Sequence, residues 1–154
     1  MSNLNHKIQQ WRALQSWERS LLVKLFFLLP LGWLVYKAFG FNRARQFAEP
    51  KLPADSTGGE QSAVEYAQRC AELTAIAARH GLYKANCLHQ SLALCRVLRQ
   101  QAMPARIRIG MRPNAQPFQA HAWVELDGIA LGQSVDEYKA FDSLASVSDT
   151  TNFK

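Results

Sequence analysis

Residues 86–128 read NCLHQSLALCRVLRQQAMPARIRIGMRPNAQPFQAHAWVELDG, and the spacing of apolar residues changes within this stretch. Over 87–101 apolar residues recur at intervals of three and four, which predicts a helix. Over 106–112 they alternate with polar residues, which predicts a half-buried strand. A second strand is expected over 118–126, and the Asp-Gly pair at 127–128 is a strong signal for a hairpin turn.

The flanking sequence extends this pattern on both sides. A helical pattern covers 62–80 and ends at Gly81, a favourable residue after a helix. After the hairpin we expect a returning strand over 129–133 and a short helix within 134–144. Helices followed by an antiparallel sheet predict an α+β fold.

Composition divides the chain into four parts. Residues 48–61 (AEPKLPADSTGGEQ) combine two prolines, a Gly pair and polar residues, which is typical of a linker. The linker separates an apolar N-terminal segment, 1–47, from a main domain, 62–144. A Ser/Thr/Asp-rich tail over 145–154 completes the chain.

The most apolar stretch is 21–39, LLVKLFFLLPLGWLVYKAF. Lys24 lies inside it, Pro30 is expected to break it, and the unbroken apolar run from Leu25 is shorter than the roughly 20 residues that a bilayer requires. We expect a kinked or paired helix that packs on the rest of the protein or rests on a membrane face. A tilted membrane span is the alternative.

Charge and cysteine content narrow the classes of partner and ligand. With 154 residues, 48% hydrophobic and 19% charged, the chain suits one packed domain, and its net charge of +6 suits an acidic partner. The basic residues are scattered without interleaved aromatic residues, so nucleic-acid binding is not expected. The three cysteines form no disulfide framework, which indicates a cytoplasmic protein. Their spacing is not that of metal ligands, so we expect no metal site. The sequence also contains no glycine-rich phosphate-binding loop, and we expect no cofactor.

Cys87 lies where the predicted helix begins. A helix N-terminus carries partial positive charge and free N–H groups, which favour a thiolate and can hold a developing oxyanion. This position makes Cys87 the candidate nucleophile. The alternative is that Cys87 is a buried, inert residue like Cys70 or Cys95.

His121 is the candidate base. It lies in the middle of the strand FQAHAWVEL and shares one face with Gln119, Trp123 and Glu125. That face is polar, so the imidazole can take a proton from a thiol if the helix packs over it. The alternative is an exposed histidine without a role.

A third group should orient the imidazole, and the sequence leaves two candidates. A two-residue turn at the Asp-Gly pair would place Ser134 and Asp136 on the face of His121. A bulge at Gly128 would shift the register by one residue and bring Gln133 to that face instead.

The quoted stretch resembles the transglutaminase-like domain of lasso-peptide biosynthesis proteins, the leader peptidases of microcin-type precursors. The matching motifs are the CLHQSLAL helix start, the ARIRIGMR strand and AHAWVELDG, in the order and spacing of the family. The apolar N-terminal stretch is also similar to the family's N-terminal helical part. The resemblance covers about 16–141.

This resemblance implies a papain/transglutaminase-like fold and a Cys-His-Asp triad that removes the leader from a ribosomally made precursor peptide. Cys87 and His121 carry over directly, whereas the family's aspartate falls at or near Gln133. A glutamine can orient an imidazole but carries no charge to stabilise an imidazolium, which leaves Asp136 as the alternative third residue. The implied partners are a precursor peptide, a leader-recognition protein and a lasso cyclase.

Two other functions fit the same residues. One is a different acyl-transfer reaction on the same fold, such as that of an amidase or a transglutaminase. The other is a non-catalytic scaffold that holds the precursor peptide. Gln133 in place of the family's aspartate and the amphipathic N-terminal segment favour this alternative.

Overall fold

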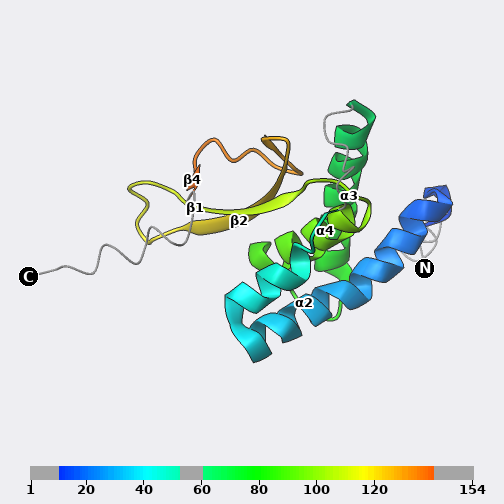
Figure 1. Cartoon of the computed structure of the whole chain (residues 1–154), viewed down its shortest axis with the longest axis horizontal. Helices are drawn as coiled ribbons and strands as arrows, with labels where there is room; N and C mark the ends of the chain where they lie inside the picture. The colour runs from blue at the N-terminus through cyan, green and yellow to red at the C-terminus, as the bar shows by residue number, and fades with distance from the viewer. Residues whose placement is uncertain (1–10, 53–60, 141–154) are drawn as a thin grey trace, which may run out of the picture.

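The computed structural model describes residues 11–52 and 61–140, and the predicted α+β architecture is confirmed (Figure 1). Its helices precede a small antiparallel sheet. The elements are α2 (Ser16–Ala48), α3 (Gln61–His80), α4 (Cys87–Gln100), β1 (Arg106–Met111), β2 (Ala120–Leu126), β3 (Ile129–Ala130) and β4 (Lys139–Ala140).

The sheet has the strand order β3-β2-β1-β4, and each neighbouring pair is antiparallel. The predicted hairpin is confirmed, because Leu126 pairs directly with Ile129. Asp127 and Gly128 have φ values of 50° and 82°, as a tight two-residue turn between twisted strands requires. Of the two registers that the sequence left open, the tight two-residue turn is therefore confirmed and the bulge at Gly128 is wrong.

Strand lengths differ from expectation on both sides of this hairpin. β2 begins at Ala120, two residues later than predicted, and β3 ends at Ala130 instead of continuing to 133. The predicted short helix is wrong for 134–140, where the chain makes turns and then forms β4. Pairing of β4 with β1 accounts for the difference, because it satisfies backbone groups that a helix would otherwise satisfy internally.

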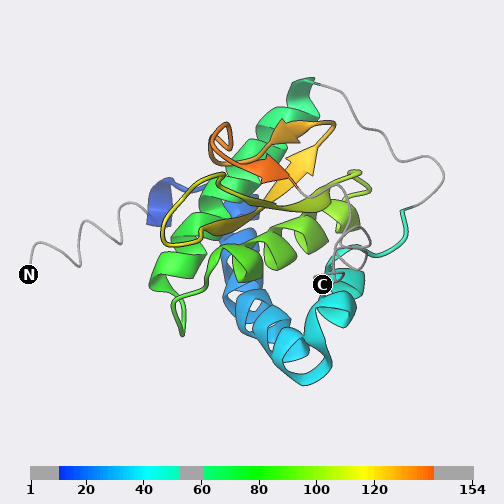
Figure 2. The same cartoon turned by 90° about the vertical axis from the view of Figure 1, so that its left-hand side faces the viewer.

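Helix α2 consists of two limbs that meet at a sharp corner, visible in Figure 2. The break lies at Gly40, whose φ of 77° and ψ of 180° are not helical, and not at Pro30, where the helix continues. A proline removes one hydrogen bond, whereas a glycine in the left-handed region redirects the whole chain. The expectation of a kinked helix is confirmed, and its predicted position is wrong.

The core lies where α4 is packed between α2 and the sheet (Figures 1 and 2). Leu25 of α2, Leu92 of α4 and Val124 of β2 are each at most 1% exposed and belong to one buried cluster. Helix α3 contributes Leu73 to the same cluster. The described part of the 1–47 segment thus shares its core with the predicted main domain. The proposed boundaries themselves stay predictions, and the tail at 145–154 lies outside the described residues.

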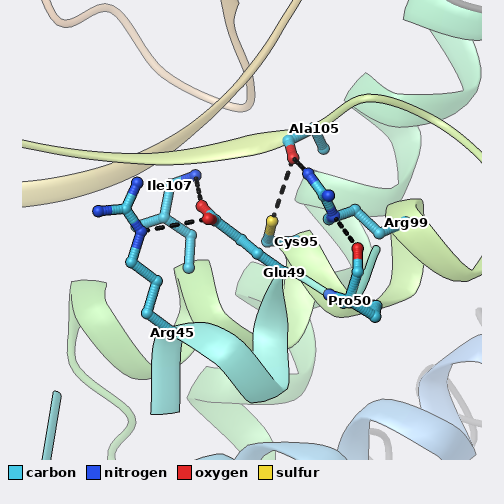
Figure 3. Close-up of polar contacts among 7 residues, drawn as sticks. All are labelled: Arg45, Glu49, Pro50, Cys95, Arg99, Ala105 and Ile107. Atoms are coloured by element: carbon cyan, nitrogen blue, oxygen red, sulfur yellow. Dashed lines mark hydrogen bonds and ion pairs between the residues drawn. The ribbon is translucent and has the colours of Figure 1, made fainter. Parts of the chain in front are cut away.

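A set of polar contacts joins the end of α2 to α4 and the start of β1 (Figure 3). The Glu49 carboxylate accepts a hydrogen bond from the Ile107 amide at 2.8 Å and pairs with Arg45 at 3.1 Å. From α4, Arg99 donates to the Pro50 carbonyl at 2.8 Å and to the Ala105 carbonyl at 2.9 Å. These contacts fix the start of β1 relative to both helices.

Candidate active site

Cys87 is the first residue of α4, and the residue before it explains why the helix begins there. Asn86 has extended backbone angles, and its side-chain oxygen accepts a hydrogen bond from the His89 amide at 3.0 Å. The helical ladder starts with the Gln90 amide, which donates to the Asn86 carbonyl. Capping of this kind leaves the amides of Cys87 and its neighbour in the first turn, where no intrahelical acceptor exists. The thiol therefore lies at the positive end of the helix dipole.

The three cysteines have different surroundings. Cys70 and Cys95 are fully buried, whereas Cys87 is partly exposed. Burial raises the pKa of the Cys70 thiol to about 11 and also raises the pKa of Cys95. Burial opposes thiolate formation at these two positions. Cys87 is thus the cysteine suited to nucleophilic chemistry.

Cys87 and His121 both line a pocket of about 170 Å³. It lies between α3, α4, strand β2 and the segment that follows β3. Its polar lining also includes Thr74, Ser91 and Gln133. The remaining lining residues are Ala71, Ala75, Gln90, Leu94, Ala122, Trp123, Val124, Leu131 and Gly132.

The structure places Gln133, not Asp136, against the imidazole. The side-chain nitrogen of Gln133 lies 2.5 Å from Nε2 of His121. Asp136 is exposed and accepts a hydrogen bond from the Ser134 hydroxyl at 2.7 Å. The tight turn that was expected to favour Asp136 is present, yet the glutamine makes the contact.

Gly132 explains why Gln133 contacts His121 although the hairpin has a tight two-residue turn. The pairing of the hairpin extends to Leu131, whose amide donates to the Val124 carbonyl at 2.9 Å. Gly132 then adopts a φ of 77°, so the alternation of faces along the strand stops and the chain turns toward His121. Gln68 of α3 holds this turn, since its side chain accepts from the Gly132 amide at 2.7 Å and donates to the Ala130 carbonyl at 3.2 Å.

Two aromatic rings flank the His121 imidazole. Trp123 stacks on it with ring centroids 6.3 Å apart and an interplanar angle of 17°, and the Tyr138 ring lies 5.1 Å away. Trp123 is itself fixed, because its indole N–H donates to Glu125 at 2.9 Å, and Glu125 pairs with Arg108. The imidazole therefore has a defined plane, which a base needs if it is to act on a neighbouring thiol.

The contact between Gln133 and His121 permits two proton arrangements. An amide nitrogen can donate to an unprotonated Nε2, which leaves the ring proton on Nδ1. With the amide turned by 180°, its oxygen accepts from Nε2–H and leaves Nδ1 free to take a proton. Only the second arrangement orients His121 as a base for a thiol on its Nδ1 side.

Some residues of this site were not singled out from the sequence. Trp123 is two residues from His121 in the same strand, so the alternation of faces alone places its side chain beside the imidazole. Thr74, Ser91 and Tyr138 carried no such signal, because tertiary packing alone brings them to the site. Within 11–52 and 61–140, no group of three or more His, Cys, Asp or Glu side chains is arranged to hold a metal ion.

Comparison with known proteins supplies the family. The family model described as transglutaminase-like superfamily matches residues 33–146. Over 47 residues the chain is 43% identical to the microcin J25-processing protein McjB of Escherichia coli, an alignment that covers 30% of this chain and 22% of that protein. The match thus spans only about a fifth of this relative's length. No solved structure matches this chain. The match to the family model covers most of the chain, which therefore belongs to the transglutaminase-like superfamily.

Proposed function

We propose that this protein is a cysteine peptidase that removes the leader from a ribosomally made lasso-type precursor peptide. The observation that carries the proposal is the pocket shared by Cys87 and His121, with Gln133 against Nε2 of the imidazole. The similarity to a microcin J25-processing protein supports the class of substrate.

The proposed reaction has two stages, as in other thiol hydrolases. In the first, His121 takes the thiol proton, Cys87 attacks the scissile carbonyl, and first-turn amides of α4 stabilise the oxyanion. The amide C–N bond then breaks, and the leaving amine takes its proton from His121. In the second stage His121 removes a proton from water, and the hydroxide attacks the thioester. The C–S bond then breaks, the Cys87 sulfur takes the proton back from His121, and the leader is released with a free carboxylate.

Partners follow from the same proposal. The substrate is a precursor peptide, and the protein would act in the cytoplasm with a separate leader-recognition protein and a lasso cyclase. The pocket itself is small, so recognition of a long leader requires surface beyond it or a partner protein.

The test is single-turnover cleavage of a candidate precursor in the presence of its leader-recognition protein. We expect cleavage by the wild type, and its loss in Cys87→Ala and His121→Ala. The matched controls are Cys70→Ala, a buried cysteine outside the pocket, and His80→Ala at the exposed end of α3. Equal cleavage by Cys87→Ala and wild type would exclude Cys87 as the nucleophile.

A non-catalytic scaffold is the second candidate, and the glutamine at position 133 favours it. An amide gives the imidazolium no charge partner, which a working triad of the family would have. A scaffold predicts that the wild type binds precursor without cleaving it, and that Cys87→Ala binds equally well. Transfer of the acyl group to an added amine rather than to water would instead indicate a transglutaminase-type reaction.

A further inference from the structure

Helix α2 is apolar on the side that faces solvent as well as on the side that faces the core. Its first limb buries Leu21, Leu25, Leu28 and Leu29 against α3 and α4. The opposite side exposes Val23, Phe27, Leu31 and Leu34, with exposed fractions of 51%, 65%, 44% and 53%. These four residues, termed here the α2 stripe, recur at intervals of four, four and three and so form one line along the helix.

Such a helix is unusual at a water-exposed surface. An apolar stripe on one side is what a helix needs for packing on a core, and apolar residues all round indicate a second apolar environment. By length and composition α2 is apolar enough to cross a membrane, with a mean hydropathy of 1.7 over 18 residues, of which only 28% are buried. The α2 stripe is therefore a contiguous exposed apolar surface that calls for a contact.

The charges around the α2 stripe indicate what the contact is. Over 16–39 the sole acidic residue is Glu18, which is buried and paired with Arg69 at 2.6 Å. Exposed basic side chains lie on both sides of the stripe, Lys24 on one flank and Lys37 on the other, and Arg43 follows the corner at Gly40. Lys37 also lies over the ring of Trp33, 5.0 Å from its centroid.

We infer that the α2 stripe lies on the surface of an anionic lipid bilayer. Apolar side chains flanked by lysines and accompanied by tryptophan are suited to the boundary between lipid head groups and acyl chains. The net charge of +6 adds attraction to an anionic surface. This inference concerns where the protein is held and does not depend on the proposed peptidase activity.

The helix would lie along the membrane rather than cross it. Crossing would place Leu25 and Leu29 in lipid and remove them from a cluster in which they are 0% and 2% exposed. Lying flat preserves this packing and immerses only the opposite side.

The test is flotation of the full chain with vesicles of phosphatidylcholine alone and with vesicles that also contain phosphatidylglycerol. We expect the wild type to float with the anionic vesicles and to be released by high salt or by an alkaline carbonate wash. Phe27→Ser/Leu34→Ser should weaken binding by roughly tenfold or more, because two immersed side chains are lost. Lys37→Glu/Arg43→Glu should remove the preference for anionic vesicles.

The control replaces two equally exposed apolar side chains away from α2. Phe118 and Ile129 are 68% and 46% exposed, so Phe118→Ser/Ile129→Ser removes comparable apolar surface and should float like the wild type. Thermal unfolding of each variant checks that the fold is kept.

Several outcomes would overturn the inference. Wild-type protein that floats with neither vesicle, or stripe and control variants that bind alike, would show that the α2 stripe does not contact lipid. Resistance to the carbonate wash would show that the helix crosses the bilayer. A wild-type dimer in solution that the stripe variant converts to a monomer would assign the surface to self-association, and loss of leader-recognition protein binding would assign it to a protein partner.

Discussion

The side-chain amide of Gln133 meets Nε2 of His121 at 2.5 Å, at the position where a charged partner would stabilise an imidazolium. A neutral amide can fix the plane and the tautomer of the ring, but it supplies no negative charge at Nε2 to stabilise the imidazolium that forms during proton transfer. This relationship makes the stabilisation of a charged imidazole depend on a single replaceable side chain.

Gln133→Glu should therefore increase kcat for precursor cleavage by about fivefold, because a charged hydrogen bond is stronger than a neutral one by roughly 1 kcal/mol. Gln133→Ala should reduce kcat, since it removes the contact altogether. The control is Gln119→Glu, which adds the same charge on an exposed side chain near the start of β2. A similar gain from Gln119→Glu would mean that the net charge, not the contact, controls the rate.

Gly132 should be sensitive to substitution for two reasons. Its φ of 77° is strained for other residues, and an added Cβ would lie 2.9 Å from the Cβ of Ala71 in α3. We expect Gly132→Ala to displace Gln133 and to lower both activity and thermal stability. Gly128→Ala is the matched control, because Gly128 has a φ of 82° but no neighbour within 4 Å of an added Cβ.

A second-site change separates strain from collision at Gly132. Adding Ala71→Gly to Gly132→Ala removes the atom that the new Cβ would meet, and activity should recover in part even though a helical glycine costs about 1 kcal/mol of stability. If the double variant cleaves no better than Gly132→Ala, the collision is not the cause of the loss.

Cysteine labelling should distinguish the three thiols. In the native protein iodoacetamide should modify Cys87 first, since Cys70 and Cys95 are 0% exposed and burial raises the pKa of both. His121→Ala should slow the labelling of Cys87, and His80→Ala should leave it unchanged. Mass spectrometry of the labelled peptides measures each rate, and rapid native labelling of Cys95 would contradict the structure of the core.

His89 should make stability depend on pH. It is 6% exposed between Tyr36 and Tyr83, and within the described residues neither ring nitrogen has a hydrogen-bond partner. Burial lowers the pKa of His89, so the unfolded chain binds its proton more readily than the folded chain does. Stability from this residue is complete above about pH 6.5, the pKa of a free histidine, and falls as the pH decreases below that value.

Urea unfolding at a series of pH values between 8 and 5 measures this effect. His89→Leu should flatten the loss of unfolding free energy on the acid side, because leucine binds no proton in the unfolded chain. His80→Leu, at an exposed position, should retain the wild-type slope. An unchanged slope in His89→Leu would place the acid sensitivity elsewhere.

The sequence predicted the positions of Cys87 and His121 because local rules determine them. The apolar pattern of a helix indicates where that helix begins, and alternation along a strand selects the faces. The resemblance to the family supplied the pairing of these two residues. The fold class and the hairpin turn were likewise predictable from period and turn residues.

The position of Gln133 and the position of the corner in α2 could not be predicted, because each depends on the backbone conformation of a glycine. Alternation assumes a continuous strand, so it could not place Gln133, which follows a left-handed residue at Gly132. In α2 the sequence predicts a break at Pro30, whereas the corner lies at Gly40. In both cases tertiary packing selects a conformation that glycine permits but does not require.

The two halves of the site differ in how far apart their residues lie along the chain. His121 and Gln133 belong to one hairpin and are separated by 12 positions, so the pair forms with a short loop closure as the hairpin folds. Cys87 joins them only when α4 docks between α2 and the sheet. Any fluctuation that opens this layer would leave an oriented imidazole without a nucleophile, so hydrogen exchange in α4 should report the fraction of molecules able to react.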